Sequence, residues 1–204
     1  MFRKIGIIGL GYVGGALRHW FQRNKKGYKL FFYDKYKNIG SVEDVNKADI
    51  VFVAVPTPFH GNRKGHDDSA VWESLKNIQN GKVIVIKSTV LPGTSDLAAK
   101  KFPKKTILFN PEFLIAKNSI QDFLKPERQL VGYTNSKSKK LAPGVIAILP
   151  KAPYERILKA REAEIVKYFG NTFLATRVIF ANQIYDFCKK LGGVDYNVIK
   201  ECVA

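Results

Sequence analysis

The chain has 204 residues, 46% of them hydrophobic, which is enough for a globular protein with a buried core. No apolar stretch approaches the roughly 18 residues that a membrane span needs, and no signal-peptide pattern opens the chain, so we expect a cytoplasmic protein. The net charge of +17 would attract anions, but no nucleic-acid-binding module is visible and we do not expect nucleic acid as a partner. Two cysteines, Cys188 and Cys202, are too few for a disulfide framework or a zinc site, and we expect no metal.

The N-terminal part of the chain has the order strand, glycine turn, helix, strand and acid. A short apolar run, Lys4 to Ile8, leads into Gly9-Leu10-Gly11-Tyr12-Val13-Gly14 and then into a helix-like segment that ends near Asn24. A second apolar run, Lys29 to Tyr33, ends at Asp34. The acid follows the last glycine of the turn by twenty residues. This order and spacing predict a dinucleotide-binding βαβ unit.

The glycine turn suits a dinucleotide for steric and electrostatic reasons. Gly9 permits a tight turn, Gly11 lets the backbone approach a pyrophosphate, and Gly14 lets the helix pack on the strand. The helix N-terminus presents free N–H groups to the anion. The predicted cofactor residues of this segment are therefore Gly9, Gly11, Tyr12, Val13 and Gly14.

The acid after the second strand indicates which cofactor binds. Asp34 is placed to accept hydrogen bonds from the adenosine ribose hydroxyls, and a carboxylate repels a 2′-phosphate, so we predict NAD rather than NADP. Lys35 and Lys37 follow it, and basic residues there can accommodate a 2′-phosphate, which leaves NADP as an alternative.

Strands and helices alternate after this unit, as a doubly wound parallel sheet requires. Helices are expected after Ser41, around Val71 to Leu75 and from a cap at Thr94. Strands are expected at Asp49 to Val55, Val83 to Ile86, Thr106 to Phe109 and, as the last of the domain, Gln129 to Gly132. The predicted fold is a Rossmann-like doubly wound parallel sheet followed by a long helix that starts a small helical domain.

Three predicted strands end in polar clusters. Pro56-Thr57-Pro58, Ser88-Thr89 and Asn110-Pro111-Glu112 each follow a buried apolar strand. Ligands bind beyond the carboxyl ends of the strands in open parallel sheets, so we expect the three clusters to meet at one crevice.

The C-terminal part is predicted to contain a long helix. We interpret Pro143 to Pro153 as a linker, which divides the chain into an NAD-binding domain (1–150) and a segment (151–204) with the long helix and the start of a central dimerisation domain. The helix extends over Glu162 to Leu191 and ends at Gly192-Gly193. It is apolar on more than one face, which predicts a partner surface, most simply a second copy of the chain.

Lys167 and Asn171 lie four residues apart in this helix and therefore share one face. An ammonium and a carboxamide in this arrangement can stabilise a developing alkoxide while an alcohol is oxidised. The apolar neighbours of the pair, Phe169, Phe173 and Leu174, suggest a buried lysine, which needs a functional or structural reason.

The motifs together resemble the UDP-glucose/GDP-mannose dehydrogenase family. They occur in the family's order and cover most of the chain. They are Gly9 to Gly14, Phe52-Val53-Ala54-Val55-Pro56-Thr57-Pro58, Lys87-Ser88-Thr89-Val90, Asn110-Pro111-Glu112-Phe113-Leu114, and Ala163-Glu164-Ile165-Val166-Lys167 with Asn171.

The resemblance implies an activity and roles for individual residues. Family members oxidise the C6 alcohol of a nucleotide sugar twice, to the carboxylate, and reduce two NAD. By this resemblance Thr57 and Thr89 line the cofactor crevice, while Glu112 with Thr89 positions a water that serves as base. Lys167 and Asn171 stabilise the oxyanion. The implied partners are a nucleotide-sugar substrate and a second copy of the chain.

The sequence also departs from the family's pattern. The segment between Lys35 and Asp49 is short, and Ala116 stands where the family usually has a second glutamate. The family's nucleophilic cysteine lies in a glycine-rich motif well past the long helix, and neither that motif nor a sugar-nucleotide domain occurs before Ala204. The second oxidation needs that cysteine, so we expect a fragment or a short relative whose chemistry is incomplete.

Two alternatives differ in class. A single-step dehydrogenase of the β-hydroxyacid type shares the glycine turn, a Ser-Thr strand end and a helical Lys-xxx-Asn, but the Val-Pro-Thr-Pro and Asn-Pro-Glu-Phe-Leu matches argue against it. A non-catalytic module that binds nucleotides or polyanions is supported by the missing cysteine motif and by the charge of +17.

Overall fold

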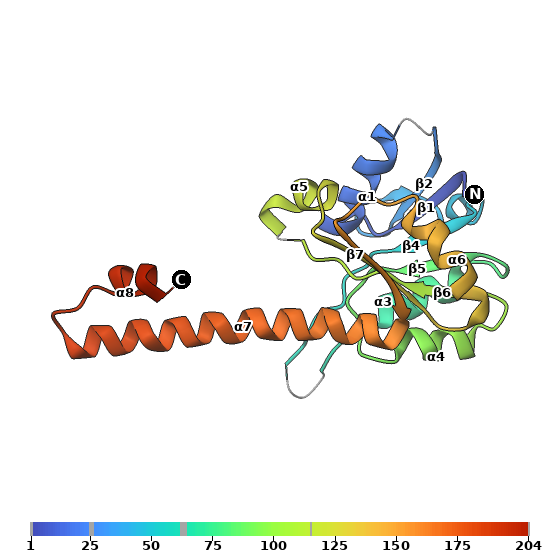
Figure 1. Cartoon of the computed structure of the whole chain (residues 1–204). Coiled ribbons are helices and arrows are strands. Elements are labelled where there is room, and N and C mark those ends of the chain that lie inside the picture. Colours follow the sequence, from blue (N-terminus) through green and yellow to red (C-terminus); the bar gives the residue numbers. More distant parts are fainter. Residues whose placement is uncertain (1, 25–26, 62–64, 115, 204) are drawn as a thin grey trace. The chain divides into compact units, whose positions relative to one another are not determined.

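The computed structural model of the chain describes residues 2–24, 27–61, 65–114 and 116–203. Within them one sheet has the strand order β3-β2-β1-β4-β5-β6-β7-β8 (Figure 1). Its strands are β1 (Lys4–Ile8), β2 (Lys29–Asp34), β3 (Ile39–Gly40), β4 (Ile50–Val53), β5 (Val83–Ile86), β6 (Thr106–Phe109), β7 (Arg128–Tyr133) and β8 (Tyr154–Lys159).

The sheet is mostly parallel. Strands β2, β1, β4, β5 and β6 run parallel to one another, whereas β3 is antiparallel to β2 and β7 is antiparallel to β6. The chain turns to one side from β1 to β2 and then crosses to the other side at β4, so β1 and β4 form the topological switch point. The predicted Rossmann-like sheet followed by a long helix is confirmed.

Helices cover both faces of the sheet because its central strands are apolar on both sides. One face packs against α1 (Tyr12–Arg23), α5 (Ser119–Leu124) and α6 (Ser136–Ile146). The other packs against α2 (Val42–Val45), α3 (Ser69–Asn77), α4 (Thr94–Lys101) and the first residues of α7 (Ala160–Leu191). Short helices complete the chain, namely the 3₁₀ turn η1 (Ala116–Asn118) and α8 (Tyr196–Val203).

Two expectations about the end of the sheet are wrong. The segment interpreted as a linker begins inside α6, and residues 154–159 form a further strand, β8, which pairs in parallel with β7. Gln129 to Gly132 therefore belongs to the second-last strand. Alternation in Tyr154-Glu155-Arg156-Ile157-Leu158-Lys159 is weak because β8 is an edge strand with both faces partly exposed, so the apolar pattern that marks a strand was missing.

The expected helix cap at Thr94 is also wrong. The N-cap of α4 is Gly93, whose φ of +98° favours glycine. The carboxylate of Glu164 from α7 accepts hydrogen bonds from the backbone N–H groups of Gly93 and Ser95, so a residue distant in sequence caps this helix. Burial raises the pKa of the Glu164 carboxyl, and these hydrogen bonds oppose that effect.

The chain forms two compact units, Met1–Lys167 and Tyr168–Ala204. In the second unit, the aromatic rings of Tyr185 and Tyr196 meet edge to face at 5.4 Å and Cys188 is buried, which joins α8 to the end of α7. Among the residues that the structure describes, no helix is long and apolar enough to span a membrane.

Candidate functional site

The glycine turn after β1 is closely packed on one side and open on the other. Gly9 has a φ of +85°, and a Cβ there would lie 2.5 Å from the carbonyl oxygen of Ala54. A Cβ on Gly14 would overlap the carbonyl oxygen of Gly9, so α1 can approach β1 only because residue 14 has no side chain. Gly11 faces open space, with nothing within 4 Å of a Cβ placed there. The backbone at Gly11 is therefore accessible to a ligand.

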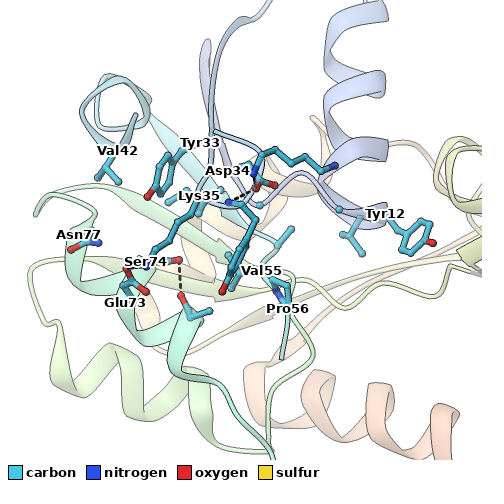
Figure 2. A pocket seen from close by; sticks show the side chains of 18 residues that line it. Tyr12, Tyr33, Asp34, Lys35, Val42, Val55, Pro56, Glu73, Ser74 and Asn77 are labelled. Atoms are coloured by element: carbon cyan, nitrogen blue, oxygen red, sulfur yellow. Dashed lines mark hydrogen bonds and ion pairs between the residues drawn. The ribbon is translucent and has the colours of Figure 1, made fainter. Parts of the chain in front are cut away.

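A cavity of about 450 Å³ lies beside this turn at the switch point between β1 and β4. Five of the predicted cofactor residues line it, namely Gly9, Gly11, Tyr12, Val13 and Asp34. Figure 2 shows Asp34 at the end of β2, Val55 and Pro56 after β4, and Tyr12 apart from them at the start of α1. Helix α3 closes the other side with Glu73, Ser74 and Asn77.

The Asp34 carboxylate is nearly buried and fixed by backbone donors. Oδ2 accepts a hydrogen bond from the N–H of Leu10 at 2.7 Å, and Oδ1 accepts from the N–H groups of Tyr36 and Lys37 at 3.0 and 2.9 Å. A carboxylate offers about four acceptor positions, so Oδ2 retains one for a further donor. The acid therefore joins the glycine turn to the end of β2 and can still accept a hydroxyl group.

The two lysines after Asp34 are engaged with the protein. Lys35 Nζ lies 3.2 Å from Glu73 Oε1 on α3, and Figure 2 shows its side chain extended in that direction. Lys37 Nζ donates to the carbonyl of Leu10 at 2.6 Å. Glu73 thus adds a second carboxylate to the Asp34 end of the cavity, which disfavours a phosphate there.

Thr57 and Thr89, the other two predicted cofactor residues, lie together at the ends of β4 and β5. The Thr57 hydroxyl donates to the Thr89 carbonyl at 2.8 Å. Neither residue lines the cavity beside the glycine turn. Gly14 also lies outside its lining, because its role is the contact between α1 and β1.

Glu112 and Lys167 form the ion pair at the centre of the predicted catalytic set. Lys167 Nζ lies 2.9 Å from Glu112 Oε1, and the two side chains are only 8% and 15% exposed. Glu112 Oε2 accepts from the N–H of Leu114 at 2.7 Å, which holds the carboxylate over its own loop. The Lys167 ammonium lies 5.8 Å from the centre of the Phe113 ring. The pair joins the segment after β6 to the start of α7.

Asn171 belongs to the second unit, where it is exposed. It follows Lys167 by one turn of α7. The structure thus brings Glu112 and Lys167 together and leaves the role of Asn171 a prediction.

The sequence matches two domains of one known family. Residues 16–149 match the NAD binding domain of the UDP-glucose/GDP-mannose dehydrogenase family, and residues 161–204 match its central domain. The chain belongs to this family.

Relatives in the family cover most of this chain but are longer. UDP-glucose 6-dehydrogenase of Rickettsia typhi is 36% identical over 169 residues, which covers 78% of this chain and 38% of the relative. The enzyme of the same name from Campylobacter jejuni is 27% identical and covers 97% of this chain and 59% of the relative. The chain thus spans well under two thirds of the length of these curated relatives.

Solved structures agree with the fold. A UDP-glucose dehydrogenase from Pyrobaculum islandicum superposes with a TM-score of 0.85 at 27% identity and covers all of this chain and 56% of that one. A UDP-D-ManNAc dehydrogenase from Pyrococcus horikoshii has the same TM-score at 20% identity, covers 98% of this chain and 57% of that one, and supports the fold alone.

Sequence reasoning missed one polar group near the Glu112–Lys167 pair. Lys87, at the end of β5, is 3% exposed, and its Nζ donates to the side-chain oxygen of Asn110 at 2.6 Å. Burial lowers the pKa of Lys87 to about 7; Glu112 acts against this effect and Lys167 adds to it. A signal was present in the sequence, because a lysine directly follows the four apolar residues of a buried strand.

Proposed function

We propose that this chain supplies the NAD-binding and hydride-transfer part of a dehydrogenase that oxidises the C6 alcohol of a nucleotide sugar. The observation that supports this most is the nearly buried ion pair between Glu112, on the segment after β6, and Lys167 of α7, in a chain whose glycine turn and cavity suit a dinucleotide. A dehydrogenase acting on an alcohol needs both parts, one for the hydride acceptor and one for the charge that develops on the oxygen.

The residues around the glycine turn fit NAD. The open backbone at Gly11 and the N-terminal N–H groups of α1 would bind the pyrophosphate. The free acceptor position of Asp34 Oδ2 would bind a ribose hydroxyl, with Glu73 nearby. When bound, NAD accepts a hydride from the alcohol carbon.

The Glu–Lys pair supplies charge stabilisation. An ammonium has three donors, and among the described residues only Glu112 accepts from Lys167, so a substrate oxygen or water can accept from the others. The carboxylate keeps the ammonium in place before the reaction, so no reorganisation is needed when negative charge develops. Thr89 and Glu112 would hold the water that takes the proton, and Asn171 would be a further donor to the oxyanion.

The proposal predicts slow NADH formation without uronate. With NAD and UDP-glucose, these 204 residues should form NADH slowly, because they span only part of the length of their relatives and fewer contacts orient the C6 carbon against the nicotinamide. Uronate should not form, because the second oxidation needs a cysteine motif that these residues do not contain. Lys167→Met should lower the NADH rate about 100-fold or more, since loss of one oxyanion donor typically has that effect. Absorbance reports NADH, and chromatography with mass detection reports uronate.

Controls separate the alternatives in this experiment. Lys105→Met removes another buried lysine, whose hydrogen bonds to described residues go to carbonyls at the end of α3, and it should leave the rate within about twofold. NAD binding without NADH would favour a non-catalytic module, and oxidation of a small β-hydroxyacid in place of the sugar nucleotide would favour the single-step enzyme. Uronate formation that persists in Cys188→Ser/Cys202→Ser would show that the cysteine-dependent route is wrong here.

NAD should bind more tightly than NADP. Two carboxylates, Asp34 and Glu73, flank the end of the cavity where a 2′-phosphate would lie, so we expect at least a tenfold difference in Kd. Asp34→Ala should reduce the NAD/NADP preference about tenfold or more, because a charged hydrogen bond contributes about 1.5–3 kcal/mol. Calorimetric titration of both cofactors measures the ratio, and equal affinities in the unsubstituted chain would contradict the prediction.

The long helix should mediate a homodimer. Within the second unit, Phe169, Phe173, Leu174 and Phe180 of α7 are each more than half exposed. This number of exposed large apolar side chains on one helix exceeds what monomers usually leave in water. Light scattering should show a dimer, and Phe169→Asp/Phe173→Asp should give a monomer, whereas the polar exchange Gln183→Asp should not. A monodisperse monomer of the unsubstituted chain at high concentration would refute the proposal.

A further inference from the structure

Lys87 is nearly buried, and its ammonium lies between a polar side chain and an aromatic ring. Its Nζ donates to the Asn110 side-chain oxygen at 2.6 Å and lies 5.6 Å from the centre of the Phe123 ring on α5. Asn110 is fully buried, and its side-chain nitrogen donates to Leu130 O at 2.6 Å and to Gln129 Oε1 at 2.9 Å. Lys87 is thus the end of a hydrogen-bonded chain that links β5, the end of β6 and β7.

The hydrogen bonds of Lys87 reach the segment that carries Glu112, the proposed catalytic carboxylate. Asn110 is two residues before Glu112, and both of its side-chain polar groups are held, by Lys87 on one side and by β7 on the other. Glu112 in turn is fixed by Leu114 N–H and by Lys167. Lys87 therefore bonds to the residue from which the Glu112 loop starts.

Lys87 also interacts electrostatically with Glu112 and Lys167. The charged groups that act on it are Glu112, which favours its protonated form, and Lys167, which disfavours it. Two lysines therefore share one carboxylate in a region from which water is largely excluded. When Lys87 is protonated, Lys87, Lys167 and Glu112 together carry a net charge of about +1. When Lys87 is neutral, the three groups together carry no net charge.

We propose that Lys87 is a positioning residue of the Glu112–Lys167 site: it fixes the Glu112 loop through its hydrogen bond to Asn110 and interacts electrostatically with both members of the ion pair. This inference rests on the proposed function, which makes Glu112 and Lys167 catalytic residues. Its test reads the lysine charges and the loop directly and uses no turnover, so failure of hydride transfer and failure of this inference are distinguishable.

Lys105 offers an internal comparison. It is also buried, it donates to carbonyls of Leu75 and Lys76, and burial likewise lowers its pKa. No carboxylate contributes to the shift of Lys105, whereas two charged groups contribute to that of Lys87. A residue that only fills a buried position should behave as Lys105 does.

The first experiment follows Lys87 and Lys105 by NMR of ¹³Cε-labelled lysine across pH. Glu112→Gln should lower the pKa of Lys87 by at least about 0.5 pH units, because it removes a negative charge that favours the protonated form. Lys167→Met should raise the pKa of Lys87 by a similar amount, because it removes a positive charge that disfavours the protonated form. The pKa of Lys105 should stay unchanged in both variants, and the exposed control Glu43→Gln should move neither lysine. Equal shifts in one direction, or no shift at all, would overturn the proposal.

The second experiment reads the position of the Glu112 loop through hydrogen exchange of the Leu114 N–H, which donates to Glu112. Lys87→Met should accelerate its exchange about tenfold by freeing Asn110, the typical effect of one net hydrogen bond. Lys105→Met should leave it within about twofold. Unchanged exchange in Lys87→Met, or equal acceleration in both variants, would show that Lys87 does not position this loop.

Discussion

Gly14→Ala should destabilise the chain by about 3 kcal/mol or more and abolish NAD binding. The new methyl group would overlap the Gly9 carbonyl, and β1, the turn and α1 are too closely packed to move apart locally. Separation of α1 from β1 would also displace the helix N-terminus from the position where a pyrophosphate binds. Urea unfolding and calorimetric titration with NAD measure the two effects.

The next residue provides a matched control. Gly15 is also in α1, and a Cβ there would have only the Leu10 carbonyl near it, at 3.9 Å. Gly15→Ala should therefore stabilise the chain by up to about 1 kcal/mol through helix propensity, with NAD binding retained. If the two alanine variants had similar stability, the steric account of the turn would be wrong.

The glycine turn also shows how much of the fold could be predicted from sequence. Its spacing, the apolar strands Val83–Ile86 and Thr106–Phe109 and the long helix are local patterns, and the structure confirms the fold class that they predicted. Strand β8 was missed because an edge strand lacks the apolar alternation on which prediction depends. The cap of α4 was missed because Glu164 supplies it from 71 residues away, and no local rule reports such a contact.

In the candidate site, too, local motifs could be predicted from the sequence, whereas tertiary contacts could not. Glu112 and Lys167 were predicted as site residues from motifs, but the motifs did not reveal that the two form a nearly buried pair at 2.9 Å. The backbone bonds of Asp34 and the ion pair of Lys35 with Glu73 depend on tertiary structure and were equally invisible. Lys87 was quoted within a motif without a role, since only burial and the bond to Asn110 distinguish it from a surface lysine.

Burial of Lys87 predicts that chain stability rises with pH above neutrality. The pKa of Lys87 falls from 10.5 to about 7 in the folded chain, so between these values the unfolded chain binds a proton that the folded chain does not. The free energy of unfolding therefore increases with pH between about pH 7 and pH 10.5. Below about pH 7 the whole of this contribution is absent. At about 1.4 kcal/mol per pH unit, this interval of about 3.5 pH units corresponds to on the order of 5 kcal/mol.

Lys87→Met should remove this rise, because methionine has similar length and no charge. The variant should be more stable than the unsubstituted chain near pH 6, where burial of the ammonium is unfavourable, and less stable near pH 10, where only the lost hydrogen bond to Asn110 remains. Urea unfolding of both proteins from pH 6 to pH 10 gives the difference, in which the other titrating groups cancel. Lys140→Met on the exposed surface of α6 is the control and should parallel the unsubstituted chain. A constant difference between Lys87→Met and the unsubstituted chain at all pH values would mean that Lys87 keeps its charge throughout, which its burial beside Lys167 argues against.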